Sequence, residues 1–229
     1  MDFPVATTCQ IQRLDHIAIH DFKIPSLRLM ENAGKKCSRI ILRGLKPGTK
    51  VAIFCGKGNN GGDGFVVGRY LLKAGMRPEI FLIGEKSGLK PDAAKNYRRY
   101  IGLGARVKEI NRLKQFNQIK PKVKNCSLIV DAIFGVGLKG RLPKFYCRLI
   151  DFFNQTQKPI VAIDVPSGLD ATSGRCLGNC VRAWKTISFS LAKKGFFRNQ
   201  GPGRCGEVKI VNIGIPRRLI KQVLKIKCR

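Results

Sequence analysis

The feature that most constrains this chain is an alternation of short apolar runs with longer amphipathic segments. Residues 51–55 (VAIFC), 127–131 (SLIVD) and 160–164 (IVAID) are apolar at nearly every position, and each run leads into a polar or glycine-rich turn. Strands without a polar face are typical of parallel sheets that helices cover on both sides. The alternation therefore predicts a three-layer α/β fold with a mainly parallel central sheet.

The individual elements can be placed along the chain. Strands are expected at 51–55, 79–83, 106–110, 127–131, 160–164, 186–191 and 207–213. Helices are expected over 10–44, with a break at Pro25, and at 65–74, 92–101, 112–119 and 144–153. No internal repeat or low-complexity linker divides the 229 residues, so the sequence predicts one domain.

Composition excludes several classes of protein. Hydrophobic residues make up 44% of the chain, too many for a disordered protein despite a net charge of +30. No apolar stretch approaches the length of a membrane span, so no membrane partner is expected. The first residues lack a basic and then apolar leader, and the nine cysteines form no CxxC pair. We therefore expect reduced thiols and a cytoplasmic location.

The charge balance narrows the choice of partners. The chain has 44 Lys and Arg against 14 Asp and Glu, so it will attract polyanions. The basic residues are dispersed, with no aromatic-interleaved stripe and no helix-turn-helix pattern, so we expect only non-specific, salt-sensitive contact with nucleic acid. The scarce carboxylates are more informative, because four of them lie in or beside apolar strand-to-turn segments: Asp63, Asp131, Asp164 and Asp170.

The first chemically unusual segment follows the strand at 51–55. Residues 56–64 (GKGNNGGDG) satisfy GxGxxG and precede a helix, whose free N–H groups suit a phosphate. A tight glycine turn without a ligand is the alternative. No GxxxxGK[ST] is present, which excludes a phosphate-cleaving P-loop. A glycine turn does not require the polar side chains of the two asparagines and Asp63, so these residues favour a ligand.

Two further strand ends carry polar groups. Asp131 ends one buried strand, where it could cap the next helix or face a ligand. Asp164 ends another, and the turn after it exposes the Ser167 hydroxyl. A Ser-His-Asp triad is improbable, since the only histidines lie in the early helix. Carboxylate, amide and hydroxyl oxygens suit a hard cation, and the small carboxylate count favours a monovalent one. Asp164 would then remain available as an acid–base group.

The sequence resembles the NAD(P)H-hydrate epimerase family (the YjeF N-terminal domain) in five motifs that occur in order: IPSLRLMENAG, GKGNNGGDG, VDAIFGVGLKG, AIDVPSGLDA and GPGRCGEVKIVNIGIP. The resemblance spans about residues 10–216, which leaves 217–229 as a basic C-terminal extension of a single domain over 1–229. It implies a Rossmann-like α/β/α sandwich. It also implies an epimerase of hydrated NADH and NADPH (NADHX and NADPHX) that works with a dehydratase, with a homodimer as one option.

The resemblance also implies functions for particular residues. Substrate contacts fall on Asn59, Asn60, Gly61, Gly62 and Asp63, on Gly135, Val136, Gly137, Leu138, Lys139, Gly140 and Arg141, and on Asp164. One potassium ion per subunit would be held by Asn60, Asp131 and Ser167. The amides of both loops, with Lys139 or Arg141, would hold the pyrophosphate, and Asp164 would act as acid or base.

The sequence departs from the family pattern at two points, and two other functions remain as alternatives. Trp184 stands where relatives carry a small polar or acidic residue, so it either fills a core gap or affects the ligand. The chain ends soon after Pro216, where many bacterial relatives continue into a dehydratase domain. A true dehydrogenase would use the same glycine turn, with Glu85 on a ribose. A non-catalytic nucleotide- or RNA-binding module of the same fold is the other alternative.

Overall fold

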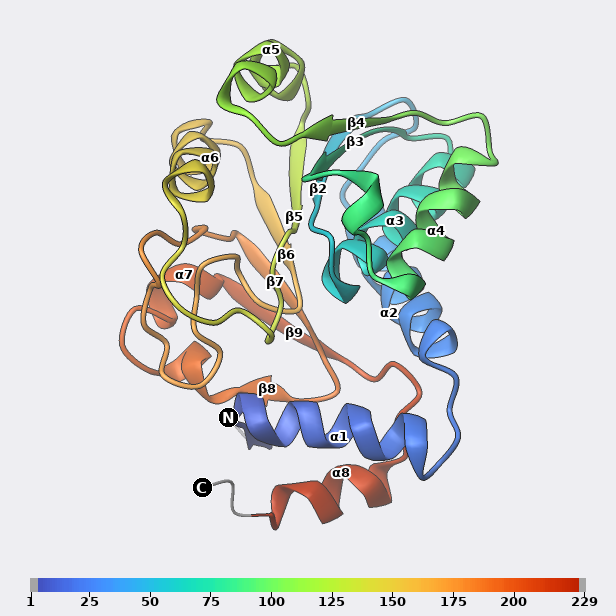
Figure 1. Cartoon of the computed structure of the whole chain (residues 1–229), viewed down its shortest axis with the longest axis vertical. Helices are drawn as coiled ribbons and strands as arrows, with labels where there is room; N and C mark the ends of the chain where they lie inside the picture. Colours follow the sequence, from blue (N-terminus) through green and yellow to red (C-terminus); the bar gives the residue numbers. More distant parts are fainter. Residues whose placement is uncertain (1–3, 227–229) are drawn as a thin grey trace.

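A sheet of seven parallel strands forms the centre of the molecule (Figure 1). The computed structural model describes residues 4–226. The strand order is β4-β3-β2-β5-β6-β7-β9. Their bounds are β2 (Lys50–Cys55), β3 (Arg77–Ile83), β4 (Val107–Ile110), β5 (Leu128–Ala132), β6 (Ile160–Ile163), β7 (Lys185–Phe189) and β9 (Glu207–Val211). The expected three-layer α/β fold is confirmed.

Helices cover both faces of this sheet. One layer holds α2 (Ser26–Leu42), α3 (Asn59–Lys73) and α4 (Pro91–Ile101), and the other holds α5 (Leu113–Lys124) and α6 (Lys144–Gln155). Successive residues of β2 point to opposite layers, since Ile53 packs in the core beneath α3 and Phe54 in the core beneath α6. Both side chains are fully buried, which explains why the strand is apolar throughout.

A smaller unit closes the lower end of the molecule in Figure 1. A two-stranded parallel sheet pairs β1 (Val5–Ala6) with β8 (Ala192–Lys193), and α1 (Thr8–His20) follows β1 directly. Thr7 and Gln10 form a capping box that begins α1. The terminal helix α8 (Arg217–Leu224) packs on α1 through the buried side chains of Leu219 and Val223. The short helices η1 (Lys86–Gly88), η2 (Lys194–Phe197) and α7 (Pro202–Cys205) complete the described elements.

The structure differs from the sequence-based expectation in several details. The helix after β2 begins at Asn59 and not at Phe65, so most of the glycine motif is helical. The segment over 10–44 forms two helices separated at Pro25, as expected. Trp184 does not fill a core gap, because it is 56% exposed and packs on Lys185. Seven cysteines are free, but Cys9 is disulfide-bonded, so the expectation of reduced thiols throughout is wrong there.

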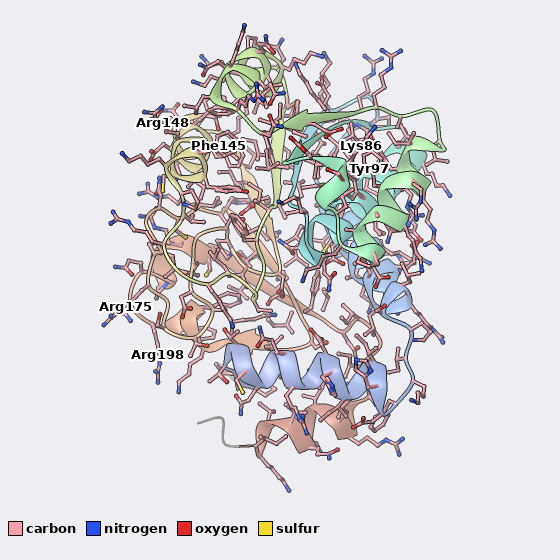
Figure 2. All side chains as sticks on the ribbon, viewed as in Figure 1. Lys86, Tyr97, Phe145, Arg148, Arg175 and Arg198 are labelled. Carbon is pink, nitrogen blue, oxygen red and sulfur yellow. The ribbon has the colours of Figure 1, made fainter. Side chains whose placement is uncertain are left out.

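The positive charge is spread over the outside of the molecule. Figure 2 shows nitrogen-tipped side chains around its whole outline, and the labelled Lys86, Arg148, Arg175 and Arg198 come from separate parts of the chain. All four are exposed. Among the described residues, no helix is both long and apolar enough to cross a membrane.

Two glycines near the start of α3 provide a test of this packing. A Cβ on Gly61 would lie 1.8 Å from the Gly56 carbonyl oxygen, whereas a Cβ on Gly58 would meet nothing within 4 Å. We expect Gly61→Ala to lower the free energy of unfolding by about 3 kcal/mol or more, since backbone atoms would have to move. The matched control Gly58→Ala should change it by about 1 kcal/mol or less. Urea unfolding measures both, and equal losses would contradict the packing described.

Candidate active site

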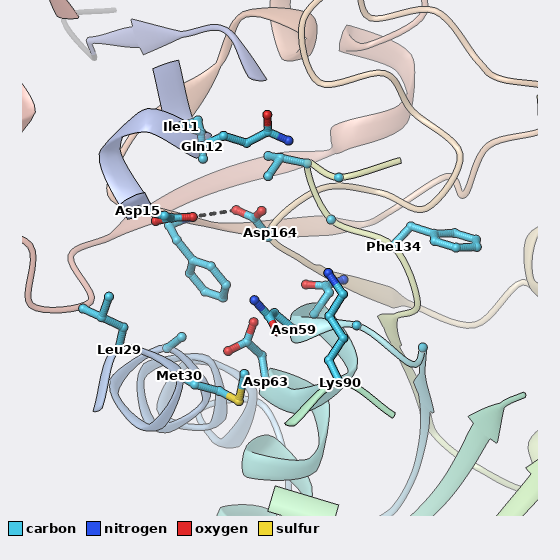
Figure 3. A pocket seen from close by; sticks show the side chains of 18 of the residues that line it. Ile11, Gln12, Asp15, Leu29, Met30, Asn59, Asp63, Lys90, Phe134 and Asp164 are labelled. Carbon is cyan, nitrogen blue, oxygen red and sulfur yellow. Dashed lines mark hydrogen bonds between the residues drawn. The ribbon is translucent and has the colours of Figure 1, made fainter. Parts of the chain in front are cut away.

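A pocket of about 560 Å³ lies at the carboxyl ends of the parallel strands (Figure 3). Its floor comes from the segments that follow β2, β5 and β6, which are adjacent in the sheet. Ile11 and Leu14 of α1 and Leu29 and Met30 of α2 give it an apolar wall. Ligands of parallel α/β sheets bind at this edge, and the volume is that of a small-molecule site.

A fully buried carboxylate ties two of these segments together. Asp131 Oδ1 accepts the Ser167 hydroxyl proton at 2.6 Å, and Oδ2 accepts the Ser167 backbone N–H at 2.8 Å. The Ser167 oxygen in turn accepts the N–H of Phe134 at 3.0 Å. Burial raises the pKa of Asp131 to about 6, although the hydrogen bonds from Ser167 and Ile133 oppose this rise. The clamp fixes the turn after β6 against the turn after β5, so Asp131 is not merely a helix cap.

Asn60 lies at the same junction and lacks a partner. Its side-chain oxygen and nitrogen are both buried, and neither has a hydrogen-bond partner among the described residues. A buried amide without partners costs free energy unless a ligand satisfies it. Gly135 lies against it, since a Cβ there would be 3.5 Å from Asn60 Oδ1 and 3.3 Å from Asp164 Oδ2. The unpartnered amide oxygen and the nearby Asp164 carboxylate are oxygen ligands of the kind that a hard cation accepts.

Asp164 enters the pocket from a strained backbone. Its φ is +65°, in the left-handed region that side chains other than glycine rarely adopt. Its Oδ1 accepts from Lys193 Nζ at 2.5 Å and from the Phe189 N–H at 3.3 Å. Such strain is retained where the surroundings hold it in place, which is common at functional sites.

Lys193 is the cation that holds Asp164, and the sequence did not single it out. The side chain is fully buried in β8, and its ammonium also donates to the Ser188 hydroxyl at 2.8 Å and to the Phe189 carbonyl at 3.2 Å. A buried lysine is rare unless it is paired. Its only sequence signal was its place directly after the apolar pair Leu191-Ala192, and 43 other basic residues obscure that signal.

Two more carboxylates face the same pocket. Asp63 on α3 is almost completely buried, and burial together with the charges of Asp164 and Asp15 raises its pKa well above its ordinary value. Asp15 on α1 is partly exposed to the pocket, and burial and then Asp164 raise its pKa to about 6, against a lowering by Lys193. Asp63 was a predicted site residue, but Asp15 was not.

The other predicted site residues lie in three different settings. Asn59 and the segment over 135–138 line the pocket. Gly61 and Gly62 are packing positions, where a Cβ would collide with the Gly56 carbonyl and the Met30 sulfur respectively. The segment over 139–141 is exposed and is absent from the lining, whereas Lys57 and Lys90 line the pocket.

The dehydrogenase alternative finds no support at Glu85. This residue is exposed, accepts a hydrogen bond from Asn111, and does not line the pocket. The structure instead contains a helix start that can accept a phosphate, a buried amide without a partner, and three carboxylates, one of which is paired with a buried lysine. This chemistry can bind an anionic nucleotide and move protons on it.

Fold and pocket together define an α/β protein of Rossmann-like architecture, with titratable side chains in a pocket at the carboxyl edge of its sheet. The model of the family described as YjeF-related protein N-terminus matches residues 26–195. The chain belongs to this family.

Curated relatives extend the comparison. The chain is 36% identical over 219 residues to the "Bifunctional NAD(P)H-hydrate repair enzyme Nnr" of Moorella thermoacetica, covering 94% of this chain and 41% of the relative. It is 34% identical over 221 residues to the "NAD(P)H-hydrate epimerase" of Elusimicrobium minutum, covering 95% of this chain and 98% of the relative. The chain thus spans less than half of the bifunctional relative and nearly all of the other.

A solved structure supports the fold. The crystal structure of the yeast protein ynu0 matches with a TM-score of 0.80 and 22% sequence identity, covering 96% of this chain and 93% of that one. At this identity the likeness bears on the fold alone.

The crowded carboxylates lead to a prediction about stability and pH. Because the folded state raises the pKa of Asp63, it keeps that proton to a higher pH than the unfolded chain does. This contribution to stability is present at low pH and is lost as the pH rises above about 4, the ordinary carboxyl value. We expect Asp63→Asn to raise the free energy of unfolding at pH 7.5 by about 1 kcal/mol or more.

At pH 5 the gain from Asp63→Asn should be smaller, because more of the wild-type carboxyl is already protonated. The control is Asp21→Asn, an exposed carboxylate next to the end of α1, which should show no such dependence on pH. Urea unfolding at both pH values measures the two variants. A loss of stability for Asp63→Asn at pH 7.5 would contradict the prediction.

Proposed function

We propose that this chain is an NAD(P)H-hydrate epimerase, an isomerase that interconverts the R and S forms of hydrated NADH and NADPH. The observation that carries the proposal is a pocket lined by Asn60 and Asp164, behind which the buried Asp131–Ser167 pair accepts the N–H of the lining residue Phe134. The relatives named as epimerases or as bifunctional repair enzymes support it, and one of them has nearly the same length as this chain.

The proposal places the reaction in a repair pathway. A dehydratase that accepts only the S form would act after the epimerase, so that both epimers return to intact cofactor. The longer, bifunctional relatives are consistent with a second activity on the same substrate. A cytoplasmic location belongs to the proposal; the seven free cysteines agree with it, whereas the disulfide at Cys9 does not. The predicted homodimer and the non-specific contact with nucleic acid stay predictions.

The phosphates of the substrate would lie at the start of α3. Gly58 caps this helix without a side-chain hydrogen bond, so the N–H groups of the first turn remain available to an anion. Lys57 and Lys90 add positive charge at the rim of the pocket. The role expected for Lys139 or Arg141 would require the exposed segment that carries them to turn toward the pocket.

A potassium ion would be held by Asn60, Asp131 and Ser167, and when bound it would supply a fixed positive charge next to the phosphates. The side chains of the pocket would position the substrate and transfer protons. The Asp131–Ser167 clamp fixes the turn that carries Asp164. Lys193 orients the Asp164 carboxylate, which would take or return a proton at the hydrated ring.

The activity can be tested with mixed epimers and an S-specific dehydratase. Adding this protein should speed the clearance of the R form. We expect Asp164→Asn to lower that rate at least about 100-fold, the scale of a general acid–base residue. The exposed Asp21→Asn serves as the control and should keep the rate. Circular dichroism and thermal melts establish that both variants fold, and an unchanged rate in folded Asp164→Asn would exclude it as the acid–base group.

The ion can be tested without measuring activity. Because binding to the folded state raises Tm, potassium chloride should raise it more than an equal concentration of choline chloride does. We expect Asn60→Ala to lose at least about half of this difference, because it removes an unpartnered oxygen. The neighbouring variant Asn59→Ala, which leaves that oxygen in place, should retain it. An equal potassium shift in wild type and Asn60→Ala would contradict the proposed ion site.

A further inference from the structure

The chemistry of the proposed reaction asks for two proton-transferring groups, and this inference therefore rests on the proposed function. Water adds to an enamine double bond at the carbon next to nitrogen, so the hydroxyl carbon of the hydrated ring also carries the ring nitrogen. Inverting that carbon by opening the ring removes a proton from the hydroxyl oxygen and adds one to the nitrogen. A base and an acid must therefore stand close together at one end of the pocket.

Asp15 is positioned to supply the second group. Figure 3 shows the carboxyl groups of Asp15 and Asp164 turned toward each other at the same end of the pocket. Both residues line the pocket, and burial, followed by the charge of Asp164, raises the pKa of Asp15. They come from different parts of the chain, since Asp15 lies on α1 and Asp164 directly after β6.

Lys193 links the two carboxylates structurally. Its ammonium is bound to Asp164, while its backbone, in β8, pairs with Ala6 of β1. The chain passes from β1 into α1 and reaches Asp15 within three turns of helix. The strand β8, which carries Lys193, is therefore paired with β1, and β1 leads directly into the helix that carries Asp15.

The two carboxyl groups have unlike surroundings, as an acid and a base require. Asp164 accepts hydrogen bonds from the Lys193 ammonium and the Phe189 N–H, which stabilise a carboxylate. Around Asp15 the charged groups are Asp164, Lys193 and Asp63, and its pKa is raised to about 6. Asp15 therefore holds a proton more readily than an exposed aspartate does. Asp63 is the more deeply buried carboxylate, whereas Asp15 is partly exposed to the pocket.

We propose that Asp15 is a second catalytic residue, the acid that acts together with Asp164 as the base. Asp164 accepts the hydroxyl proton, and the electron pair of the O–H bond forms the C=O bond of an aldehyde. The bond between that carbon and the ring nitrogen breaks, and its electron pair goes to nitrogen, which takes the proton of Asp15. Rotation about the neighbouring carbon–carbon bond exposes the other face of the aldehyde. The reverse steps close the ring and return both protons, so no further reactant is needed.

The test compares two substitutions at one position. Asp15→Asn keeps the size of the side chain but cannot donate a carboxyl proton, and it should lower kcat at least about 100-fold with little change in KM. Asp15→Glu restores the carboxyl group and should recover at least about 10-fold of this loss. The control Asp21→Asn removes the exposed carboxylate next to the end of the same helix and should behave as wild type. Thermal melts establish that each variant is folded.

An oxygen-18 experiment tests the bond that breaks. Ring opening keeps the carbon–oxygen bond, so the first turnovers in labelled water should leave the substrate oxygen unlabelled. Entry of one labelled oxygen per turnover would overturn the ring-opening step, because it requires loss of the hydroxyl group. A folded Asp15→Asn variant within about threefold of the wild-type kcat would overturn the role of Asp15. Wild-type protein without any epimerisation would instead refute the proposed function itself.

Discussion

The buried ion pair between Lys193 and Asp164 is the interaction on which the geometry of the pocket depends. Moving a lysine and an aspartate out of water is costly, and the pair is tolerated only because the ammonium finds several acceptors. Removing either partner would leave an uncompensated charge in the core. The pair anchors the side chain of a residue whose backbone is left-handed, at the end of β6. One contact thus determines both where the carboxylate points and what charge it faces.

Several buried polar groups around this pocket lower the stability of the folded state. Asp15, Asp63 and Asp131 all have raised pKa values, with burial as the first cause in each case. Asn60 adds a buried amide without a partner among the described residues. Nothing in the packing of a parallel sheet requires these groups, and apolar side chains would fill the space at lower cost. Such an accumulation of unfavourable polar groups is expected where a ligand and a reaction have been selected over stability.

The fold and half of the site were predictable because their signals are local. The apolar residues of a run such as 127–131 are enough to predict that the strand is buried. Asp131 and Ser167 stand out as polar groups at or just after the ends of such strands. Asp15 and Lys193 could not be found in this way. Their positions depend on the pairing of two strands of two residues each, β1 and β8, which lie at opposite ends of the chain. No periodicity is visible in elements of that length.

The start of α3 was mispredicted for a related reason. Glycine and asparagine are poor helix formers, so propensity places the residues 59–64 in a loop. The structure makes them helical because the helix must lie close to its neighbours, and Gly61, Gly62 and Gly64 each leave no room for a Cβ. Tight packing against β2, α2 and β5 therefore overrides local preference. The motif has a structural explanation besides its role in binding.

The charge distribution of the molecule has a consequence for how a dinucleotide would lie in the pocket. A basic exterior attracts the anionic phosphates from any direction, whereas the carboxylates inside the pocket repel them. Figure 3 shows Lys90 on the side of the pocket away from Asp15, and the Lys57 side chain lies on that side too, against Gly84 and Gly88. If a dinucleotide binds here, its phosphates would be favoured near the two lysines, and an uncharged ring would be favoured beside Asp15 and Asp164.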